Sequence, residues 1–571
     1  MIYFKIQSSR PGCKKITMPK DFLRKSLNIL LKRQTNILSA AFVIMATIVF
    51  SQILGLIRQR LLVAIFGPSN VLGVYIASTK IPDFLFQLII AGALSSVFIP
   101  IFSDFLAKGN DKDAHKMASV LLSISSLFFT VLSLVFFIFA PFFLTLLNPG
   151  AGFSSSDMEL MAGLMRVSIL AQLLFIVGTF FSALLQSYNH FFVPGFAAAL
   201  CNFGMIIGIV TLSRFVGIYS AAYGSLLGAF LFIIFQLPMI RKVGFSFKPG
   251  FSFKTPGVSR VFKLMWPRTI SIAIFQLGSI LTVTLVSFLP QSGRNYVFFD
   301  YAQTLAFAPI VLFGQTIAQA AFPVLSREKD KLEEFKATFI TSFNQIFYLV
   351  LPFSILFLIL RIPIVRLVFG ASQFDWHATV LTGRTLAFFS FSIFSQALIY
   401  LISRGFYALH DTKTPLIIGA VSTIVMVLVG FLFIFYYKIG VESIAMAYSL
   451  ASILNLVLSI TFLDRKIGGF SKTALLFPAI KIIFATFITG FALYVPIKLL
   501  DQLVFDTTKT INLLLLTGIS SLAGLSFYLF LTWFLNVKEA SNFILLFKRI
   551  GNWREVLEKS DEVIDGIKAK P

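Results

Sequence analysis

Long apolar runs follow one another along most of this chain, and they constrain its fold more than any other feature. A helix that crosses the hydrocarbon core of a membrane needs about 20 mostly apolar residues. Fourteen runs of about this length occur between residues 39 and 536, separated by short polar segments. One water-soluble core cannot bury them all, so lipid must surround them. The sequence therefore predicts an all-α integral membrane protein with about 14 transmembrane helices.

The predicted spans lie near 39–66, 72–102, 118–147, 160–186, 191–213, 217–240, 264–289, 297–325, 338–360, 384–407, 415–437, 441–463, 474–498 and 511–536. Composition agrees with this interpretation, since 57% of the 571 residues are hydrophobic and 13% are charged. Soluble domains carry about a quarter charged residues.

The distribution of basic residues predicts the orientation. If the N-terminus is cytoplasmic, the inside loops hold 17 Lys and Arg residues and the outside loops hold 7. Cytoplasmic loops of membrane proteins carry this excess. We therefore expect both termini inside, a bacterial cytoplasmic membrane location, and a first span that is retained rather than cleaved as a signal peptide.

The longest basic loop divides the spans into two sets of six, as in transporters built from paired lobes. The expected organisation is a basic cytoplasmic segment, an N-lobe with spans 1–6, a basic cytoplasmic linker, a C-lobe with spans 7–12, two further spans and a cytoplasmic tail. The corresponding ranges are 1–37, 38–240, 241–263, 264–465, 466–537 and 538–571.

Several kinds of function are disfavoured. The net charge of +24 resides mainly in short loops, which indicates topogenic charges rather than a nucleic-acid surface. The two cysteines, Cys13 and Cys201, and four dispersed histidines predict no metal site, and no nucleotide-binding or hydrolase motif occurs. We expect no cofactor, no ATP hydrolysis and no covalent catalysis.

Specific motifs accompany the spans. They are Ser51–Gly67 (SQILGLIRQRLLVAIFG), Lys80–Asp83 (KIPD), Ala91–Pro100 (AGALSSVFIP), Asn189–Ala197 (NHFFVPGFA) with Asn202 following, Phe322–Ser326 (FPVLS) and Arg404–Pro415 (RGFYALHDTKTP). In order and spacing, over residues 40–465, they resemble the MurJ/MviN family, the lipid II flippases of the multidrug/oligosaccharidyl-lipid/polysaccharide exporter superfamily.

This resemblance implies fourteen helices in two lobes around a central cavity, with the last two helices forming a lipid groove. It implies a flippase that moves a polyprenyl-diphosphate-linked peptidoglycan precursor across the membrane by alternating access, with membrane lipids as its other partners. Relative to the family, neutral residues replace common charges. These positions include Gln52, Gln59, Gly73, Phe86, Ala91, Gln303, Thr304 and Phe307.

Charged residues inside spans are costly and therefore candidates for function. Arg58, Lys80, Asp83 and Arg268 are the candidate substrate-binding residues, because Arg and Lys can hold phosphate oxygens. For Arg58 and Lys80 the alternatives are an internal pair with Asp83 or an extended side chain that reaches the interface.

Other motif residues favour a structural role. These are Asn189, Pro194, Asn202, Arg404, Asp411 and Pro415. Asp411 and Thr412 precede Pro415 and are suited to cap the eleventh span.

Three alternatives to a lipid II flippase stay open. The cargo can be another lipid-linked oligosaccharide or an amphipathic drug, which the replaced charges favour. A membrane enzyme acting on polyprenyl phosphates would need convergent carboxylates or histidines, and the spans hold few. A scaffold that does not transport is the third alternative.

Overall fold

The structure is a computed structural model that describes residues 37–93, 97–371, 373–503 and 510–541, and this part of the chain is helical without strands. Eleven of its helices are long and apolar enough to cross a membrane, or twelve if the bent pair α15 and α16 forms one span. The predicted all-α membrane fold is confirmed, whereas the count of fourteen is not.

Two of the predicted spans, near 72–102 and 264–289, explain the difference. They correspond to α3 (Asn70–Ala93) with α4 (Ile99–Ala107) and to α10 (Val258–Val286), each of which includes positions outside the described residues or side chains. Helix α10 begins inside the range predicted as a linker, 241–263. The predicted segment 1–37 and tail 538–571 lie almost wholly outside the described residues.

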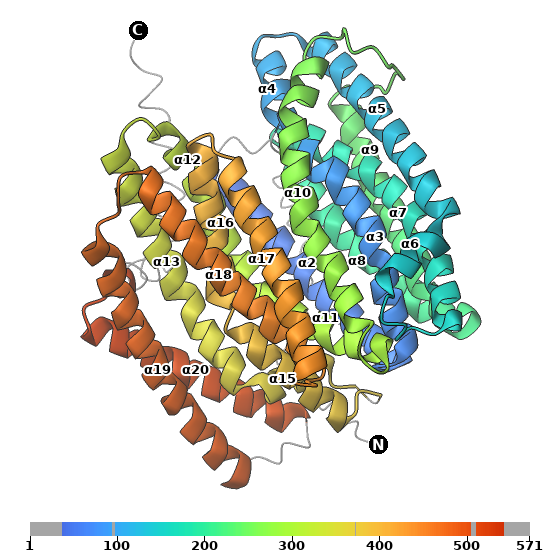
Figure 1. Ribbon diagram of the computed structural model, residues 1–571. Coiled ribbons are helices and arrows are strands. Elements are labelled where there is room, and N and C mark those ends of the chain that lie inside the picture. The colour runs from blue at the N-terminus through green and yellow to red at the C-terminus, as the bar shows by residue number, and fades with distance from the viewer. Residues whose placement is uncertain (1–36, 94–96, 372, 504–509, 542–571) are drawn as a thin grey trace, which may run out of the picture.

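Two groups of helices stand side by side in Figure 1. The N-terminal group consists of α2 (Ile37–Phe66), α3, α4, α5 (Asp111–Ile138), α6 (Ala140–Leu147), α7 (Ser155–Ser187), α8 (Phe192–Val216) and α9 (Tyr219–Lys242). Helix α10 follows this group in the chain and packs along α3, while its far end also contacts α17.

The C-terminal group begins with α11 (Ser292–Pro309), the π-helix η2 (Ile310–Gln315), α12 (Thr316–Arg327), α13 (Leu332–Ile359), α14 (Arg361–Phe369), α15 (Trp376–Ser390) and α16 (Ile393–Ala408). It continues with α17 (Lys413–Phe431), the π-helix η3 (Leu432–Tyr436), α18 (Glu442–Lys466), α19 (Lys472–Leu503) and α20 (Thr510–Phe534). The last two helices pack against each other and against α13.

Proline residues account for breaks inside the predicted spans. Pro141 has no N–H to donate to the carbonyl of Phe137, four residues earlier, and α5 ends there. Arg166 on α7 donates to that carbonyl instead, from Nε at 3.1 Å. Pro309 likewise marks the change from α11 to η2. An unpaired carbonyl in lipid is costly, so Arg166 stabilises the first break.

The groups meet at one end, which we call the closed end, and their ribbons diverge toward the other end, where α4 and α12 lie (Figure 1). At the closed end, the side-chain Oδ1 of Asn70 accepts a hydrogen bond from the N–H of Gly293 at 2.9 Å. Gly152 N–H donates to the carbonyl of Ser287 at 2.9 Å. A Cβ on Gly73 would overlap the backbone of Gly293, so α3 and α11 approach closely because both residues are glycine.

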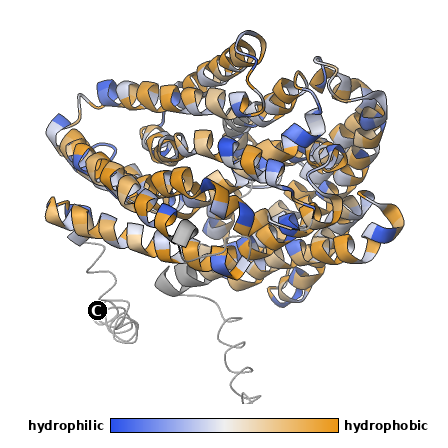
Figure 2. Cartoon of the chain, turned by 90° about the horizontal axis from the view of Figure 1, so that it is seen from below, coloured by the Kyte–Doolittle hydropathy of each residue, from blue (hydrophilic) through white to orange (hydrophobic). Residues whose placement is uncertain are grey.

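Hydrophobic residues make up most of the length of the helices in Figure 2. On α5 the exposed side chains include Leu127, Phe128 and Val131, and on α19 they include Phe484 and Phe487. An apolar exterior of this extent suits contact with lipid rather than water.

Candidate functional site

Arg58 lies in the second half of α2 and is held by neighbouring α8. Its Nη1 donates to Oδ1 of Asn202 at 3.0 Å and lies 3.1 Å from Sδ of Met205. Its Nε is buried and has no hydrogen-bond partner. No carboxylate oxygen lies within 4.0 Å of this guanidinium among the described residues. Arg58 is therefore a partly buried cation with an unmet donor, an arrangement that favours an anionic ligand.

Asn202 fixes the position of Arg58. Its Nδ2 donates to the carbonyl of Ser51 at 3.1 Å and to the Ser51 hydroxyl at 3.2 Å, which directs Oδ1 toward the guanidinium. The sequence indicated Asn202 as a structural motif residue, and these contacts give it a specific partner. Gln52, next to Ser51, is exposed.

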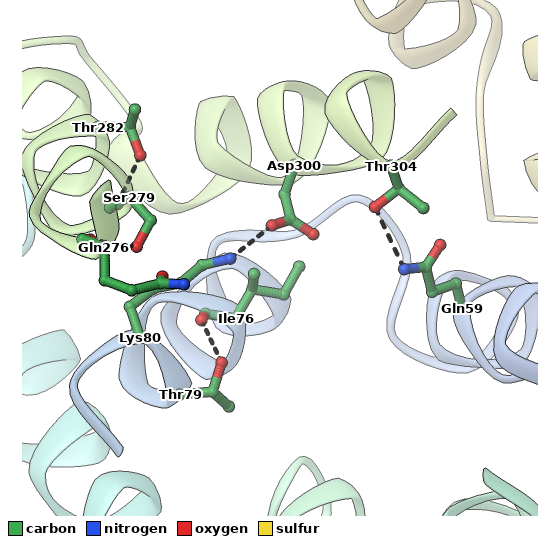
Figure 3. A network of polar contacts seen from close by, with 9 residues as sticks. All are labelled: Gln59, Ile76, Thr79, Lys80, Gln276, Ser279, Thr282, Asp300 and Thr304. Atoms are coloured by element: carbon green, nitrogen blue, oxygen red, sulfur yellow. Dashed lines mark hydrogen bonds and ion pairs between the residues drawn. The ribbon is translucent and has the colours of Figure 1, made fainter. Parts of the chain in front are cut away.

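Lys80 on α3 forms an ion pair with Asp300 on α11, with 2.8 Å between Nζ and Oδ1 (Figure 3). The two side chains are 18% and 15% exposed, so water screens this pair only partly. The Lys80 ammonium also lies 5.6 Å from the centre of the Tyr296 ring. This pair joins the two helix groups.

Asp300 was missed by the sequence interpretation, although it lies in the predicted span 297–325. The signal was available, because a carboxylate inside a span is rare and calls for a partner. The sequence interpretation considered only Asp83 as a carboxylate partner for Lys80. That alternative is wrong, because Asp83 accepts a hydrogen bond from Nε2 of Gln172 on α7, at 2.7 Å, while Lys80 pairs with Asp300.

Neutral side chains meet where α2 and α11 approach each other. Gln59 donates through Nε2 to the Thr304 hydroxyl at 3.4 Å, and the Tyr301 hydroxyl donates to the carbonyl of Gln59 at 3.1 Å. Gln59 and Thr304 are two of the positions where the resembled family commonly carries charge, and here they contact each other (Figure 3). Gln276 on α10 reaches Gln87 on α3 in the same region.

Three other replaced positions lie in close contacts between helices or against the hydrophobic core. Gly73 lies against Gly293, and the Phe86 ring packs edge-on against Phe175 with 6.4 Å between centres. Phe307 is partly buried against the main hydrophobic core. The side chain of Arg268, on α10, lies outside the described residues.

The Arg404–Pro415 motif forms the turn between α16 and α17. Asp411 accepts from the N–H of Thr414 at 3.0 Å and from its hydroxyl at 2.8 Å, and it pairs with Lys466 of α18 at 2.6 Å. Burial alone would raise the pKa of Asp411, but the hydrogen bonds from Lys466 and Thr414 outweigh it and leave the pKa below its usual value. Thr412, also expected to cap, makes no capping bond with its side chain.

Other motif residues also lie at helix ends. Asn189 has a left-handed backbone, with φ of 61°, in the turn before α8. Pro194 and Pro415 are buried in the first turns of α8 and α17, where a missing N–H costs little. The Arg404 guanidinium lies 5.3 Å from the centre of the Phe322 ring. These residues shape turns and helix contacts around the two groups.

Comparison of the sequence with known proteins finds a matching family and individual relatives. The profile of the family described as Lipid II flippase MurJ matches residues 62–514. The chain is 25% identical over 471 residues to the probable lipid II flippase MurJ of Buchnera aphidicola subsp. Acyrthosiphon pisum, covering 82% of this chain and 91% of that one. It is 25% identical over 431 residues to the lipid II flippase MurJ of Burkholderia cenocepacia, covering 74% and 83%.

Solved structures share the fold. A lipid II flippase MurJ in an inward closed conformation superposes with a TM-score of 0.70 at 23% identity, covering 86% of this chain and 99% of that chain. A multidrug resistance transporter of the MATE family, in an inward-facing conformation, gives a TM-score of 0.61 at 13% identity and covers 73% and 94%.

Proposed function

This chain belongs to the lipid II flippase MurJ family, and on that premise we propose that it moves lipid II across the cytoplasmic membrane. The proposed cargo is a polyprenyl diphosphate that carries a sugar head. The cargo crosses intact, without chemical catalysis, while the two helix groups open alternately to each side of the membrane. The observation that carries this proposal is the Arg58 guanidinium, which has an unmet Nε donor and no carboxylate partner among the described residues.

Arg58 and Lys80 divide the binding of the diphosphate. A guanidinium can hold two phosphate oxygens in parallel, whereas an ammonium acts as a point charge. Asn202 and Met205 contact Nη1 of Arg58, and the remaining donors of the guanidinium are the ones that bind the cargo. Lys80 becomes available only when Asp300 releases it, so the diphosphate competes with Asp300.

This competition links binding to movement. Lys80 and Asp300 belong to different helix groups, so an anion that takes Lys80 removes one contact that holds the closed end together. A ligand shifts a conformational equilibrium only by its differential affinity for the two states. The cargo has such a difference in affinity because it binds Lys80 best when the ion pair between Lys80 and Asp300 is broken.

The proposed N-lobe contains α2 to α9 and the proposed C-lobe contains α10 to α18, although α10 packs along α3 of the N-lobe. Helices α19 and α20 are the proposed groove for the polyprenyl tail, since exposed apolar side chains, such as Phe487 and Leu522, line their outer faces. Both termini are proposed to be cytoplasmic. The closed end then faces outward, because it gathers loops that the charge distribution assigns to the outside.

A second cargo is favoured by one observation. Where family members commonly carry charges, Gln59 and Thr304 make a neutral hydrogen bond at 3.4 Å. A site with fewer charges suits another lipid-linked oligosaccharide with the same diphosphate but a different head group. The two cargoes share Arg58 and Lys80 and differ in what contacts the sugar.

Purified protein in lipid vesicles tests the proposal. We expect fluorescent lipid II to move between leaflets in the absence of ATP and to be recovered intact. Faster movement of another lipid-linked oligosaccharide would support the second cargo. Release of phosphate from the lipid would instead indicate an enzyme, and no movement of any lipid-linked sugar would indicate a scaffold.

A further inference from the structure

The segment 243–257, which joins α9 to α10, contains the same five residues twice. Gly244–Lys248 and Gly250–Lys254 both read Gly-Phe-Ser-Phe-Lys. From Arg241 to Lys263 the chain carries six Lys or Arg residues and no Asp or Glu. The segment is thus aromatic and purely cationic.

The two copies differ in burial. Phe245, in the first copy, is 6% exposed and packs in the hydrophobic core formed by α4, α5, α7 and α9. Phe247, Phe251 and Phe253 are 46%, 57% and 58% exposed. One ring therefore anchors the segment, while three rings within seven residues stay largely exposed, and of these Phe253 also contacts the Phe262 ring with 5.4 Å between centres. Water disfavours such a cluster, which indicates that something apolar covers it.

The segment lies on the outer side of α5. The N–H of Lys248 donates to the Ser119 hydroxyl, and the N–H of Gly250 donates to the Ser123 hydroxyl, both at 3.3 Å. Ser123 lies one helical turn before Leu127, whose side chain is 52% exposed and opens the apolar outer surface of α5. Both serines fall at the start of the predicted span 118–147. The segment therefore lies at the edge of the lipid-facing surface.

We propose that segment 243–257 is an interfacial anchor that binds anionic phospholipid. Phe247, Phe251 and Phe253 enter the boundary between head groups and acyl chains, and Lys248 and Lys254 contact the lipid phosphates. Aromatic rings and lysines together are suited to this depth, where one end is apolar and the other is charged. The partner is anionic because the segment has no acidic residue to pair with its own lysines.

The depth of the rings is measurable by spin labelling of the full-length protein. Cys13 and Cys201 are replaced by Ser, and Phe247→Cys or Phe251→Cys carries the label in bilayers with or without phosphatidylglycerol. We expect the label to collide more with oxygen than with a water-soluble nickel chelate, and more so with phosphatidylglycerol. Lys331→Cys, in the exposed turn before α13, is the matched control and should favour the nickel chelate.

The charge requirement is tested by Lys248→Gln with Lys254→Gln. Each lysine near an anionic surface raises affinity roughly fivefold, so the double variant should retain roughly twenty-five-fold less phosphatidylglycerol in native mass spectrometry. Free inorganic phosphate should not restore the immersion of the rings. Labels at 247 and 251 that behave like the label at 331 in both bilayers would overturn the anchor.

Two other results would also contradict it. If the labelled positions enter the bilayer equally well without phosphatidylglycerol and without both lysines, the anionic head group has no role. If truncation after Ser541 makes the labels accessible to the nickel chelate, the group that covers the rings is the protein's own tail, which carries acidic residues.

Discussion

Lys80 on α3 and Asp300 on α11 form a 2.8 Å ion pair two helical turns or so from the close contact between Gly73 and Gly293. Both contacts join α3 to α11, and the ion pair lies further from the closed end than the glycine contact does. The glycine contact fixes how near α3 and α11 come, and the ion pair supplies an attraction that depends on charge. Closure at this end therefore depends both on the close approach of two glycine backbones and on Lys80, which is also proposed to bind the cargo.

Removing the carboxylate of Asp300 should loosen the closed end. Asp300→Asn leaves a mostly buried ammonium without a charged partner, which costs roughly 1–3 kcal/mol. We expect spin labels at Ser155→Cys and His377→Cys, which flank the closed end, to show a larger population at long distance. The same variant should bind lipid II more tightly and turn over more slowly, since nothing competes for Lys80.

A double-mutant cycle isolates the pair from the separate effects of each residue. The charge reversal Lys80→Asp with Asp300→Lys should restore the short-distance population. Additive effects of Lys80→Met and Asp300→Asn on that population would show that the two residues do not act together.

Arg58→Ala should nearly abolish lipid II movement while membrane expression stays normal. A charge-assisted contact is worth roughly 1.5–3 kcal/mol, and only two cations are proposed to share the diphosphate. Arg58→Lys should restore part of the rate, because an ammonium lacks the guanidinium fork. Arg214→Ala, at the exposed end of α8, is the matched control. Rates are measured in vesicles and divided by the amount of folded protein.

A structural role for Arg58 gives a different pattern. Arg58→Ala would then lower expression or stability, and Arg58→Gln would recover both. Wild-type movement by a well-folded Arg58→Ala protein would remove this residue from cargo binding.

Gly73→Ala should hold the closed end apart. A methyl group at this position overlaps the Gly293 backbone, which cannot move aside as a flexible side chain would. We expect longer distances between labels at positions 155 and 377, and slower transport. Gly278→Ala, on α10, places its methyl group in open space and should behave like the wild type. Identical label distances in the two variants would show that the glycine contact does not limit closure.

Helix positions could be predicted from the sequence because lipid requires long apolar runs, and a run of the necessary length is visible without any tertiary contact. Arg58 and Lys80 were found for the same reason, since charge stands out in such runs. Their partners were harder to find. Asn202 is neutral and lies 144 residues from Arg58, and Asp300 lies 220 residues from Lys80.

Helix breaks illustrate the same limit. Hydropathy along the run 118–147 gives no hint that α5 stops before α6, and only Pro141 itself marks the break. Nor does it show that Arg166 compensates the break, since that contact joins two helices. Hydropathy reports which segments lie in lipid, whereas pairing between helices depends on the fold.

Cysteine labelling in intact cells tests the orientation. Ser155→Cys, at the closed end, should react with a membrane-impermeant maleimide when Cys13 and Cys201 are absent, because the closed end is proposed to face outward. Lys331→Cys should react only after the membrane is permeabilised. Both residues are exposed, so access to the reagent depends on the side of the membrane rather than on burial. The reverse pattern would reject the orientation inferred from the basic residues.

Asp411 should stabilise the protein above its pKa and lose this effect in acid. Its folded pKa is depressed, mainly because the bonds from Lys466 and Thr414 outweigh burial, so the carboxylate's contribution is fully present above the unfolded pKa of about 3.9. That contribution is lost as the pH falls through the folded pKa. At neutral pH we expect Asp411→Asn to lower the free energy of unfolding by about 1 kcal/mol, because the amide oxygen still accepts the Thr414 N–H but the charge-assisted bond to Lys466 is lost. Thermal unfolding in detergent should show the two proteins converging as the pH approaches 3. A difference that stays constant with pH would mean that the charge of Asp411 and its pairing with Lys466 do not stabilise the protein.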